Sequence, residues 1–347
     1  MRIGPVYESL TERLGALLNM VPVPVGLSMY GMPIARTLQV AQRLGIFAEL
    51  AKGPASGAQL ADRLGLREQG TKLLLDSLCV NGVLRVRSER YELTRRSRKW
   101  LDPASDSYLG GFIADNYHYW NWWEGLEELV RNGRAVEMHD RPADDPYWRS
   151  YITGQYQLAR LSSADVAKAV GLAQGAKSLL DVAGGHGEFS MALCRRHPDL
   201  HATIVDLPGS AAIGREFVAE AGLSDRITYV ENDMFDATLG GPHDGALCFN
   251  IIHHLKPDAM RELFSRIAAS LRPGAPLCVL DLFDRPPGES PDISSMLGLF
   301  FHLTSEADTY TSDEVSEWLA ASGFEPAERK TLRQLPGLAL LRAERSN

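Results

Sequence analysis

The sequence predicts a two-domain α/β protein, in which an α-helical winged-helix domain precedes a Rossmann-like domain with a mostly parallel sheet and a C-terminal antiparallel hairpin. Three observations support this fold class. Residues 33–99 have the pattern of helices followed by two short strands. From Ser178 onward, short apolar runs alternate with helical stretches, as in a parallel sheet covered on both faces. The last two strand-like runs lie too close together for a crossover helix, so they must pair antiparallel.

Size and composition fit a soluble globular chain of two domains. The chain has 347 residues, 45% of them hydrophobic and 23% charged. Its four cysteines form no CxxC pair, which favours buried, reduced thiols. The formal net charge of −8 argues against a nucleic-acid-binding surface as the main feature.

The N-terminal segment has no basic region followed by an uninterrupted apolar core. Its most apolar stretch, residues 17–32, is broken by Pro22 and Pro24. We therefore expect neither a signal peptide nor a membrane span, and we expect the protein to be cytoplasmic.

The N-terminal domain is predicted from helix periodicity and stop signals. Residues 33–50 have the apolar spacing of one amphipathic helix, and 55–66 read as a helix capped near Ser56. Residues 67–84 predict a longer helix that ends at Asn81-Gly82. Residues 83–94 then predict two short strands around a polar turn. Helices followed by such a wing indicate a winged helix.

Winged helices often bind DNA, so a transcription regulator is an alternative. The presumptive recognition helix carries a dense leucine face, which suits packing better than reading a DNA groove. A basic run around the wing could contact DNA, or it could be a solvated or protein-facing surface. This run consists of Arg85, Arg87, Arg90, Arg95, Arg96, Arg98 and Lys99.

Residues 105–170 are predicted to be helical and contain the aromatic sequence YHYWNWWEGL. On one continuous helix, Tyr119, Trp123 and Leu126 would share a face, with Trp120 and Trp122 off it. Such a cluster is typical of packed core or a subunit interface. A wall for a flat aromatic ligand is the alternative.

The glycine-containing loop DVAGGHGEFS, Asp181–Ser190, follows the first predicted strand and leads into a helix. Small residues there allow a ligand to approach the backbone at the carboxyl end of the sheet. The loop is neither a P-loop nor a full GxGxxG. The second strand ends in Asp206, suited to a ribose diol, and the third is followed by Asp233 and Met234, suited to an adenine. Acidic strand ends favour a ligand with cationic and hydroxyl groups, such as S-adenosylmethionine.

These motifs resemble those of the S-adenosylmethionine-dependent O-methyltransferases of small-molecule biosynthesis, the plant caffeic-acid type and its bacterial polyketide-tailoring relatives. DVAGGHG is similar to the family's DVGGGxG, with Ala183 in place of the first glycine, and VDLP and NDMF match two further motifs. The resemblance implies a class I methyltransferase fold with a homodimer formed through the N-terminal domain, and it weakens the regulator interpretation. It implies a winged-helix dimerisation domain over 1–104, a helical linker contributing to the substrate pocket over 105–170, and a cofactor-binding domain over 171–347. The implied cofactor-binding residues are Asp181, Ala183, Gly184, Gly185, Asp206, Leu207, Asp233, Met234 and Asn250.

The resemblance also assigns roles around FNIIHHLKPD, residues 249–258. The family pattern LKxVLHDW ends in a base that deprotonates the acceptor hydroxyl, and His253 takes its place. His254 stands where the family has aspartate, and Phe249 where it has a lysine that touches the cofactor. Asp281, at the end of the next strand, is expected to orient His253. A direct role for His254 in catalysis is left open.

A second family acid falls near Thr309. It is either missing or supplied by Asp308 or Glu306. His302 lies in a predicted pocket helix, so His253, His254 and His302 with an acid could form a metal site. Because the aspartate of the metal-binding pattern is replaced by His254, no metal is assigned.

We therefore expect methyl transfer to a hydroxyl of a small aromatic natural-product acceptor, with S-adenosylmethionine as cofactor and no nucleic-acid or membrane partner. C-methylation of an aromatic or keto-acid acceptor, with or without a metal, is the alternative. The sequence does not identify the acceptor. The expected substrate-pocket residues are Trp120, Trp123, Tyr156, Met296, Phe300 and His302.

Overall fold

The computed structural model describes residues 9–284, 293–332 and 338–347. The chain divides into two compact units, Met1–Tyr119 and Trp120–Asn347. The predicted helical linker 105–170 is shared between these units, with its first fifteen residues in the N-terminal one.

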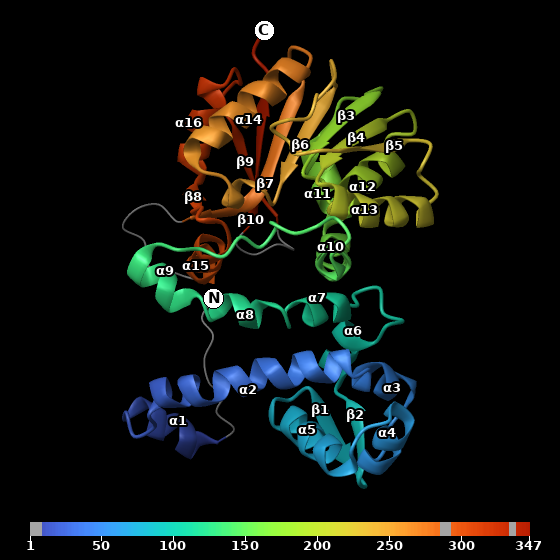
Figure 1. The fold of residues 1–347 in the computed structure, drawn as a ribbon, viewed down its shortest axis with the longest axis vertical. Coiled ribbons are helices and arrows are strands. Elements are labelled where there is room, and N and C mark those ends of the chain that lie inside the picture. Colours follow the sequence, from blue (N-terminus) through green and yellow to red (C-terminus); the bar gives the residue numbers. More distant parts are fainter. Residues whose placement is uncertain (1–8, 285–292, 333–337) are drawn as a thin grey trace. The chain divides into compact units, whose positions relative to one another are not determined.

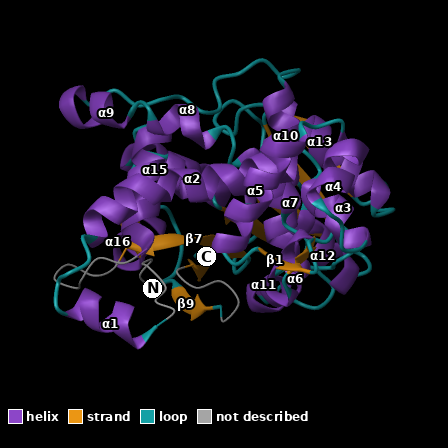
Figure 2. Cartoon of the chain, turned by 90° about the horizontal axis from the view of Figure 1, so that it is seen from below, coloured by secondary structure: helices purple, strands orange, loops and turns teal. Residues whose placement is uncertain are grey.

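The N-terminal unit consists of helices followed by a two-stranded antiparallel sheet, as predicted for a winged helix. Strands β1 and β2 lie against helices α3, α5 and α6 (Figure 1, Figure 2). The core of this unit includes Phe47, Leu60 and Leu75. The elements are α1 (Leu10–Leu17), α2 (Val23–Arg43), α3 (Ile46–Lys52), α4 (Gly57–Leu64), α5 (Glu68–Val80), β1 (Leu84–Arg87), β2 (Arg90–Leu93), α6 (Arg95–Leu101) and α7 (Gly110–Asp115).

Local signals explain most of these boundaries. Ser56 and Gln59 form a reciprocal capping box at the start of α4, which confirms the predicted cap. The prediction of one helix over residues 33–50 is wrong, because Gly45 adopts φ 78° and separates α2 from α3. Helix α2 also begins ten residues earlier than expected. Pro24 lies in its first turn, where a missing N–H costs no helical hydrogen bond.

The basic run around the wing is largely engaged within the chain. Arg85 and Arg87 lie 2.7 and 3.8 Å from the Glu92 carboxylate. Arg98 forms a 3.0 Å ion pair with Asp102. Several of its charges are therefore balanced by neighbouring acids.

The C-terminal unit is built on an eight-stranded sheet in the order β5-β4-β3-β6-β7-β10-β9, with β8 paired to β7. Strands β3 to β7 are parallel, and the terminal hairpin β9–β10 is antiparallel, as predicted. The short β8 was not predicted, and the expected turn at Pro336-Gly337 lies outside the described residues. The strands are β3 (Ser178–Val182), β4 (His201–Asp206), β5 (Ile227–Glu231), β6 (Gly245–Phe249), β7 (Pro276–Asp284), β8 (Tyr310–Thr311), β9 (Glu328–Thr331) and β10 (Leu338–Glu344).

Helices cover both faces of this sheet, as the apolar runs predicted. Consecutive strand residues point to opposite faces, so Leu179 packs with α11, α12 and α13 while Leu180 packs with α14 and α16. The helices of this unit are α9 (Leu126–Asn132), α10 (Pro146–Arg160), α11 (Ser163–Val170), α12 (Glu188–Arg196), α13 (Pro208–Glu220), α14 (Pro257–Ser270), α15 (Ile293–Ser305) and α16 (Ser312–Ala321), with α8 (Tyr119–Trp123) at the boundary and a 3₁₀ turn, η1 (Ile252–His254), after β6.

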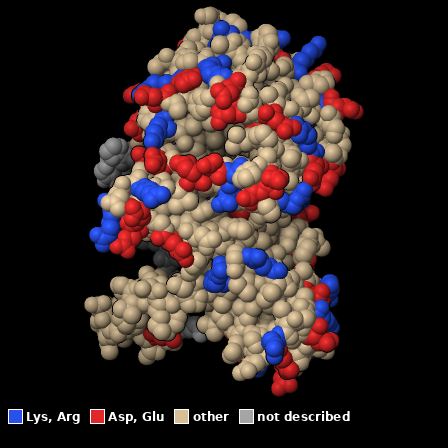
Figure 3. Space-filling view, in the orientation of Figure 1, with Lys and Arg blue, Asp and Glu red and all other residues tan. Residues whose placement is uncertain are grey.

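The strand order reverses direction between β3 and β6. In open α/β sheets, ligands bind outside the carboxyl ends of the strands at such a switch point. On the face of this unit seen in Figure 3, acidic and basic side chains are interspersed. Within the described ranges, we find no helix long and apolar enough to cross a bilayer.

Candidate active site

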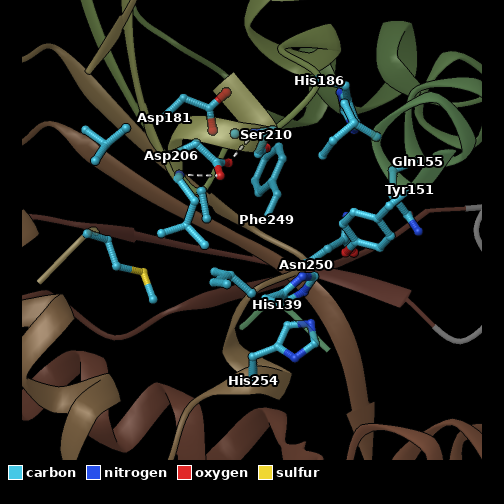
Figure 4. A pocket seen from close by; sticks show the side chains of 18 of the residues that line it. His139, Tyr151, Gln155, Asp181, His186, Asp206, Ser210, Phe249, Asn250 and His254 are labelled. Atoms are coloured by element: carbon cyan, nitrogen blue, oxygen red, sulfur yellow. Dashed lines mark hydrogen bonds between the residues drawn. The ribbon is translucent and has the colours of Figure 1, made fainter. Parts of the chain in front are cut away.

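A pocket lies at the carboxyl ends of β3 to β6, within the C-terminal unit (Figure 4). Its open space, including the mouth, is about 920 Å³. Its wall comes from the loops after four strands and from one face of α10. The lining residues are His139, Trp148, Tyr151, Ile152, Gln155, Asp181, Ala183, Gly184, Gly185, His186, Phe189, Val205, Asp206, Leu207, Ser210, Asn232, Asp233, Met234, Phe249, Asn250, Ile251 and His254.

The glycine-containing loop after β3 approaches the pocket closely. A Cβ added at Gly184 would lie only 2.6 Å from the Asp181 carboxyl group, so no side chain fits there. Ala183 adopts φ 56°, which glycine tolerates better than alanine. The substitution of the family's first glycine therefore occurs at a position where glycine is favoured.

Two buried carboxyl groups flank this loop. Asp181 accepts a hydrogen bond from Ser190 Oγ at 2.6 Å, and Asp206 accepts from the backbone N–H groups of Gly185 and Leu207, both at 2.7 Å. Burial raises the pKa of Asp181 to about 7 and that of Asp206 to about 6. A cation beside Asp181 and hydroxyl donors at Asp206 would stabilise the ionised carboxylates.

The loop after β5 contributes a carboxylate next to an apolar side chain. The backbone N–H of Phe235 donates to Asp233 Oδ1 at 2.8 Å, which fixes the carboxylate beside Met234. Asn250 follows β6 with φ 52°, and its backbone N–H donates to the Leu280 carbonyl. A fixed acceptor beside an apolar side chain suits an adenine ring. All nine residues expected to bind the cofactor thus lie in one pocket, and their donors, acceptors and close backbone approach fit S-adenosylmethionine.

His253 and Asp281 form a buried pair behind this pocket. His253 Nδ1 lies 2.6 Å from Asp281 Oδ1, and Asp281 also accepts from the backbone N–H groups of Ile252 and Leu282. The carboxylate accepts, so Nδ1 carries the proton and Nε2 is free to act as a base. The His253 ring stacks on Phe301, with centroids 3.7 Å apart.

His254 has a different environment. Ser305 Oγ donates its hydrogen to the Phe301 carbonyl, so it accepts from His254 Nδ1 at 3.0 Å. The other ring nitrogen of His254, Nε2, is therefore unprotonated. Burial, with His253 and His139 nearby, lowers the His254 pKa well below its usual value. Of the two adjacent histidines, His254 contributes to the pocket wall.

His139 was not expected in the pocket, and the residues of α10 that line it are others than Tyr156, the residue of that helix expected there. The His139 ring lies 5.2 Å from His254 and stacks on Trp148, and burial lowers its pKa to about 4. His139 lies in an irregular segment between helices, so neither helical nor strand periodicity marked it in the sequence. Trp148, Ile152 and Gln155 are spaced by four and three residues, and this spacing on one helical face was the usable signal.

The expected substrate residues are only partly brought together. Phe300 is buried against Trp122 and Trp123. The prediction that Tyr119, Trp123 and Leu126 share one helical face is wrong, because α8 ends at Trp123 and α9 begins at Leu126. Trp122, predicted to lie off the packed face, is 3% exposed, and Trp123 is 37% exposed.

The remaining expected substrate residues lie in other surroundings. Tyr156 stacks on Phe217 with centroids 4.2 Å apart, so it packs against α13. Met296 is 57% exposed on α15, and Trp120 is partly buried in α8.

The two residues expected to supply the second family acid, Glu306 and Asp308, form ion pairs with other side chains. Glu306 pairs with Lys256 at 3.0 Å, and Asp308 pairs with His302 at 3.3 Å. His302 Nδ1 also lies 3.1 Å from the Ala307 carbonyl oxygen. Among the residues that the structure describes, no three His, Cys, Asp or Glu side chains are grouped to hold a metal ion.

The fold and pocket define a class I methyltransferase. Residues 125–325 match the model of the O-methyltransferase domain, and residues 28–103 match that of the O-methyltransferase dimerisation domain. The chain therefore belongs to the S-adenosylmethionine-dependent O-methyltransferase family.

The similarity to known proteins covers most of the chain. The 3-hydroxy-5-methyl-1-naphthoate 3-O-methyltransferase of Streptomyces sahachiroi is 28% identical over 87% of this chain and 89% of its own length. The N,N-dimethyltransferase OxyT of Streptomyces rimosus is 27% identical over 87% of this chain and 90% of its own. Human N-acetylserotonin methyltransferase in complex with SAM has a TM-score of 0.82 at 19% identity and covers 99% of this chain and 100% of that one.

Proposed function

We propose that this enzyme methylates a hydroxyl group of a small aromatic natural product, with His253 as the general base. The observation that carries this proposal is the 2.6 Å contact between His253 Nδ1 and Asp281 Oδ1, which leaves Nε2 unprotonated. A methyltransferase acting on oxygen needs such a base, because a neutral phenol is a poor nucleophile.

S-Adenosylmethionine, when bound, supplies an electrophilic methyl group on a sulfonium. His253 Nε2 accepts the acceptor's hydroxyl proton and leaves its oxygen as the nucleophile. Complete proton transfer from a phenol of pKa about 10 to an imidazole of pKa about 6.5 is uphill by about 5 kcal/mol. The base therefore works best when the proton moves as the new bond forms. Asp281 holds the imidazole in the required tautomer and stabilises its protonated form.

The cofactor contacts are assigned by chemistry. Asp206 would accept from the ribose hydroxyls, Asp233 would accept from the adenine amino group, and Met234 would cover the ring. Asp181 would attract the cationic amino group. Trp123, which is 37% exposed and packs against the buried Phe300, would offer an apolar ring to an aromatic acceptor.

Replacing His253 with Ala tests the base assignment. We expect turnover to fall by about 10² to 10⁴, while the dissociation constant for S-adenosylhomocysteine stays within about threefold. The matched variant is His254→Ala, because His254 carries the neighbouring unprotonated Nε2. If His254→Ala loses turnover and His253→Ala keeps it, the base is His254.

A homodimer formed through the N-terminal unit is part of the proposal. The dimerisation-domain match at residues 28–103 supports it. A second support is the run of exposed apolar side chains on α1 and α2, which a partner chain would cover. These include Leu14, Leu17, Val25, Leu27, Met29, Tyr30 and Met32.

A further inference from the structure

His186, the variable residue of the glycine-containing loop, lies in the pocket wall next to the start of α12. It is 8% exposed, and no role followed from its sequence context. The backbone N–H of Glu188 donates to His186 Nδ1 at 3.0 Å. A backbone N–H can only donate, so Nδ1 is unprotonated and the neutral ring carries its proton on Nε2.

This Nε2–H group is a donor without an acceptor. Among the described residues, no hydrogen-bond partner of His186 Nε2 is found. The neighbouring rings of Tyr156 and Phe189 have centroids 6.2 and 5.7 Å away. Because His186 lines the pocket, this Nε2–H group is available to an acceptor on the ligand.

The start of the adjacent helix suits an anionic acceptor, whereas the charged residues that line the pocket are the acids Asp181, Asp206 and Asp233. Helix α12 begins at Glu188, and the first N–H groups of a helix carry a partial positive charge. The Glu188 carboxylate does not occupy this position, because it accepts from Ser163 Oγ at 2.8 Å and lies 3.7 Å from Arg195. None of the described residues that line the pocket is Lys or Arg. An anionic ligand group in this pocket must therefore rely on neutral donors.

We propose that His186 binds the carboxylate of the cofactor's methionyl group through its Nε2–H, beside the N-terminus of α12. This inference rests on the cofactor assignment and adds a residue to it. With the Asp181 carboxylate on the same loop, the chain presents an acceptor for the ammonium group and a donor for the carboxylate. The zwitterionic end of the cofactor is then recognised without a basic side chain.

The test compares two ligands by calorimetry on the full-length protein. S-Adenosylhomocysteine carries the carboxylate, and its decarboxylated analogue keeps the amine and lacks the carboxylate. The wild type should prefer S-adenosylhomocysteine. His186→Phe keeps a buried ring and removes the donor, so it should weaken S-adenosylhomocysteine binding by about tenfold to a hundredfold. Binding of the decarboxylated analogue should change by less than about threefold.

Three further variants make the result specific. His186→Gln retains an amide donor and should recover part of the preference; if His186→Phe fails to fold, His186→Leu, which also lacks a donor, takes its place. His201→Phe alters an exposed histidine at the opposite end of the sheet and should change neither affinity. Gln155→Leu removes the amide of another lining residue.

The proposal is overturned if His186→Phe weakens both ligands equally, if it weakens neither, or if the carboxylate preference depends on Gln155 instead. A wild type that binds both ligands equally well also overturns it. A folded wild type that binds neither ligand would refute the cofactor assignment itself, and the inference with it.

Discussion

The carboxylate of Asp281 holds the imidazole of His253 from behind, with Oδ1 2.6 Å from Nδ1. Asp281 is itself fixed by two backbone N–H groups, those of Ile252 and Leu282, and is 1% exposed. The orientation of the base is thus set by strand β7 and the turn after β6. Catalysis should therefore depend on Asp281 as strongly as on the reactive ring.

Asp281→Asn should lower kcat by about 10² to 10⁴, because an amide neither stabilises a protonated imidazole nor enforces the tautomer. Steady-state kinetics with an unmethylated aromatic acceptor that the wild type methylates would measure this loss. The dissociation constant for S-adenosylhomocysteine should stay nearly unchanged. Asp308→Asn, which alters the exposed partner of His302, is the matched control and should keep kcat. Wild-type turnover in Asp281→Asn would contradict the assigned role.

The affinity for S-adenosylhomocysteine should weaken as the pH falls below about 7. Burial raises the pKa of Asp181 to about 7 and that of Asp206 to about 6. The ionised forms attract the ammonium group and accept from the ribose hydroxyls, so binding is strongest above both values and is lost as each carboxylate takes up a proton. Each group should contribute up to about tenfold per pH unit below its pKa.

Calorimetry between about pH 5.5 and 8 measures this dependence. Asp181→Asn should bind more weakly at pH 8 and show a shallower decline. An affinity that stays flat or rises as the pH falls would contradict the assigned charges.

Gly184→Ala should abolish cofactor binding and destabilise the fold by about 1 to 3 kcal/mol. The added Cβ would lie 2.6 Å from the Asp181 carboxyl group, which is held by Ser190. Gly70→Ala in helix α5 is the control, because nothing lies within 4 Å of its Cβ. That substitution should raise the free energy of unfolding by about 0.5 to 1 kcal/mol. Chemical denaturation and ligand titration measure both effects, and an intact Gly184→Ala site would disprove the close approach.

Met29→Arg should weaken the homodimer. Met29 is 63% exposed on α2, within the apolar run that we assign to the interface, and burying an unpaired charge there is unfavourable. Sedimentation at several protein concentrations should show a dimeric wild type and a larger monomer fraction in the variant. Glu68→Arg, a charge change at the start of α5, should not shift the equilibrium. A monomeric wild type would overturn the proposed assembly.

Much of the fold could be predicted because its signals are local. Each parallel strand is a short apolar run, and Ser56 and Asn81 mark helix ends by their own chemistry. The single helix over 33–50 failed for the opposite reason. Apolar periodicity continued across Gly45, although the backbone there turns to positive φ.

The site, too, contains residues that local sequence signals predict and residues that they do not. Asp181, Asp206 and Asp233 could be predicted because each lies at or just after the carboxyl end of a strand, and parallel strands bring these ends together. His139 could not, because it lies in an irregular segment and reaches the pocket only through tertiary packing against Trp148 and His254. The tautomer of His186 depends on one backbone N–H, which no sequence pattern reveals.

A crystal structure of the complex with S-adenosylhomocysteine tests the central claim most directly. We expect the adenine beside Asp233 and Met234, the ribose hydroxyls on Asp206, and the sulfur directed toward His254 and toward His253 behind it. Electron density for the ligand elsewhere, or a sulfur directed away from both histidines, would contradict the proposed site and its chemistry.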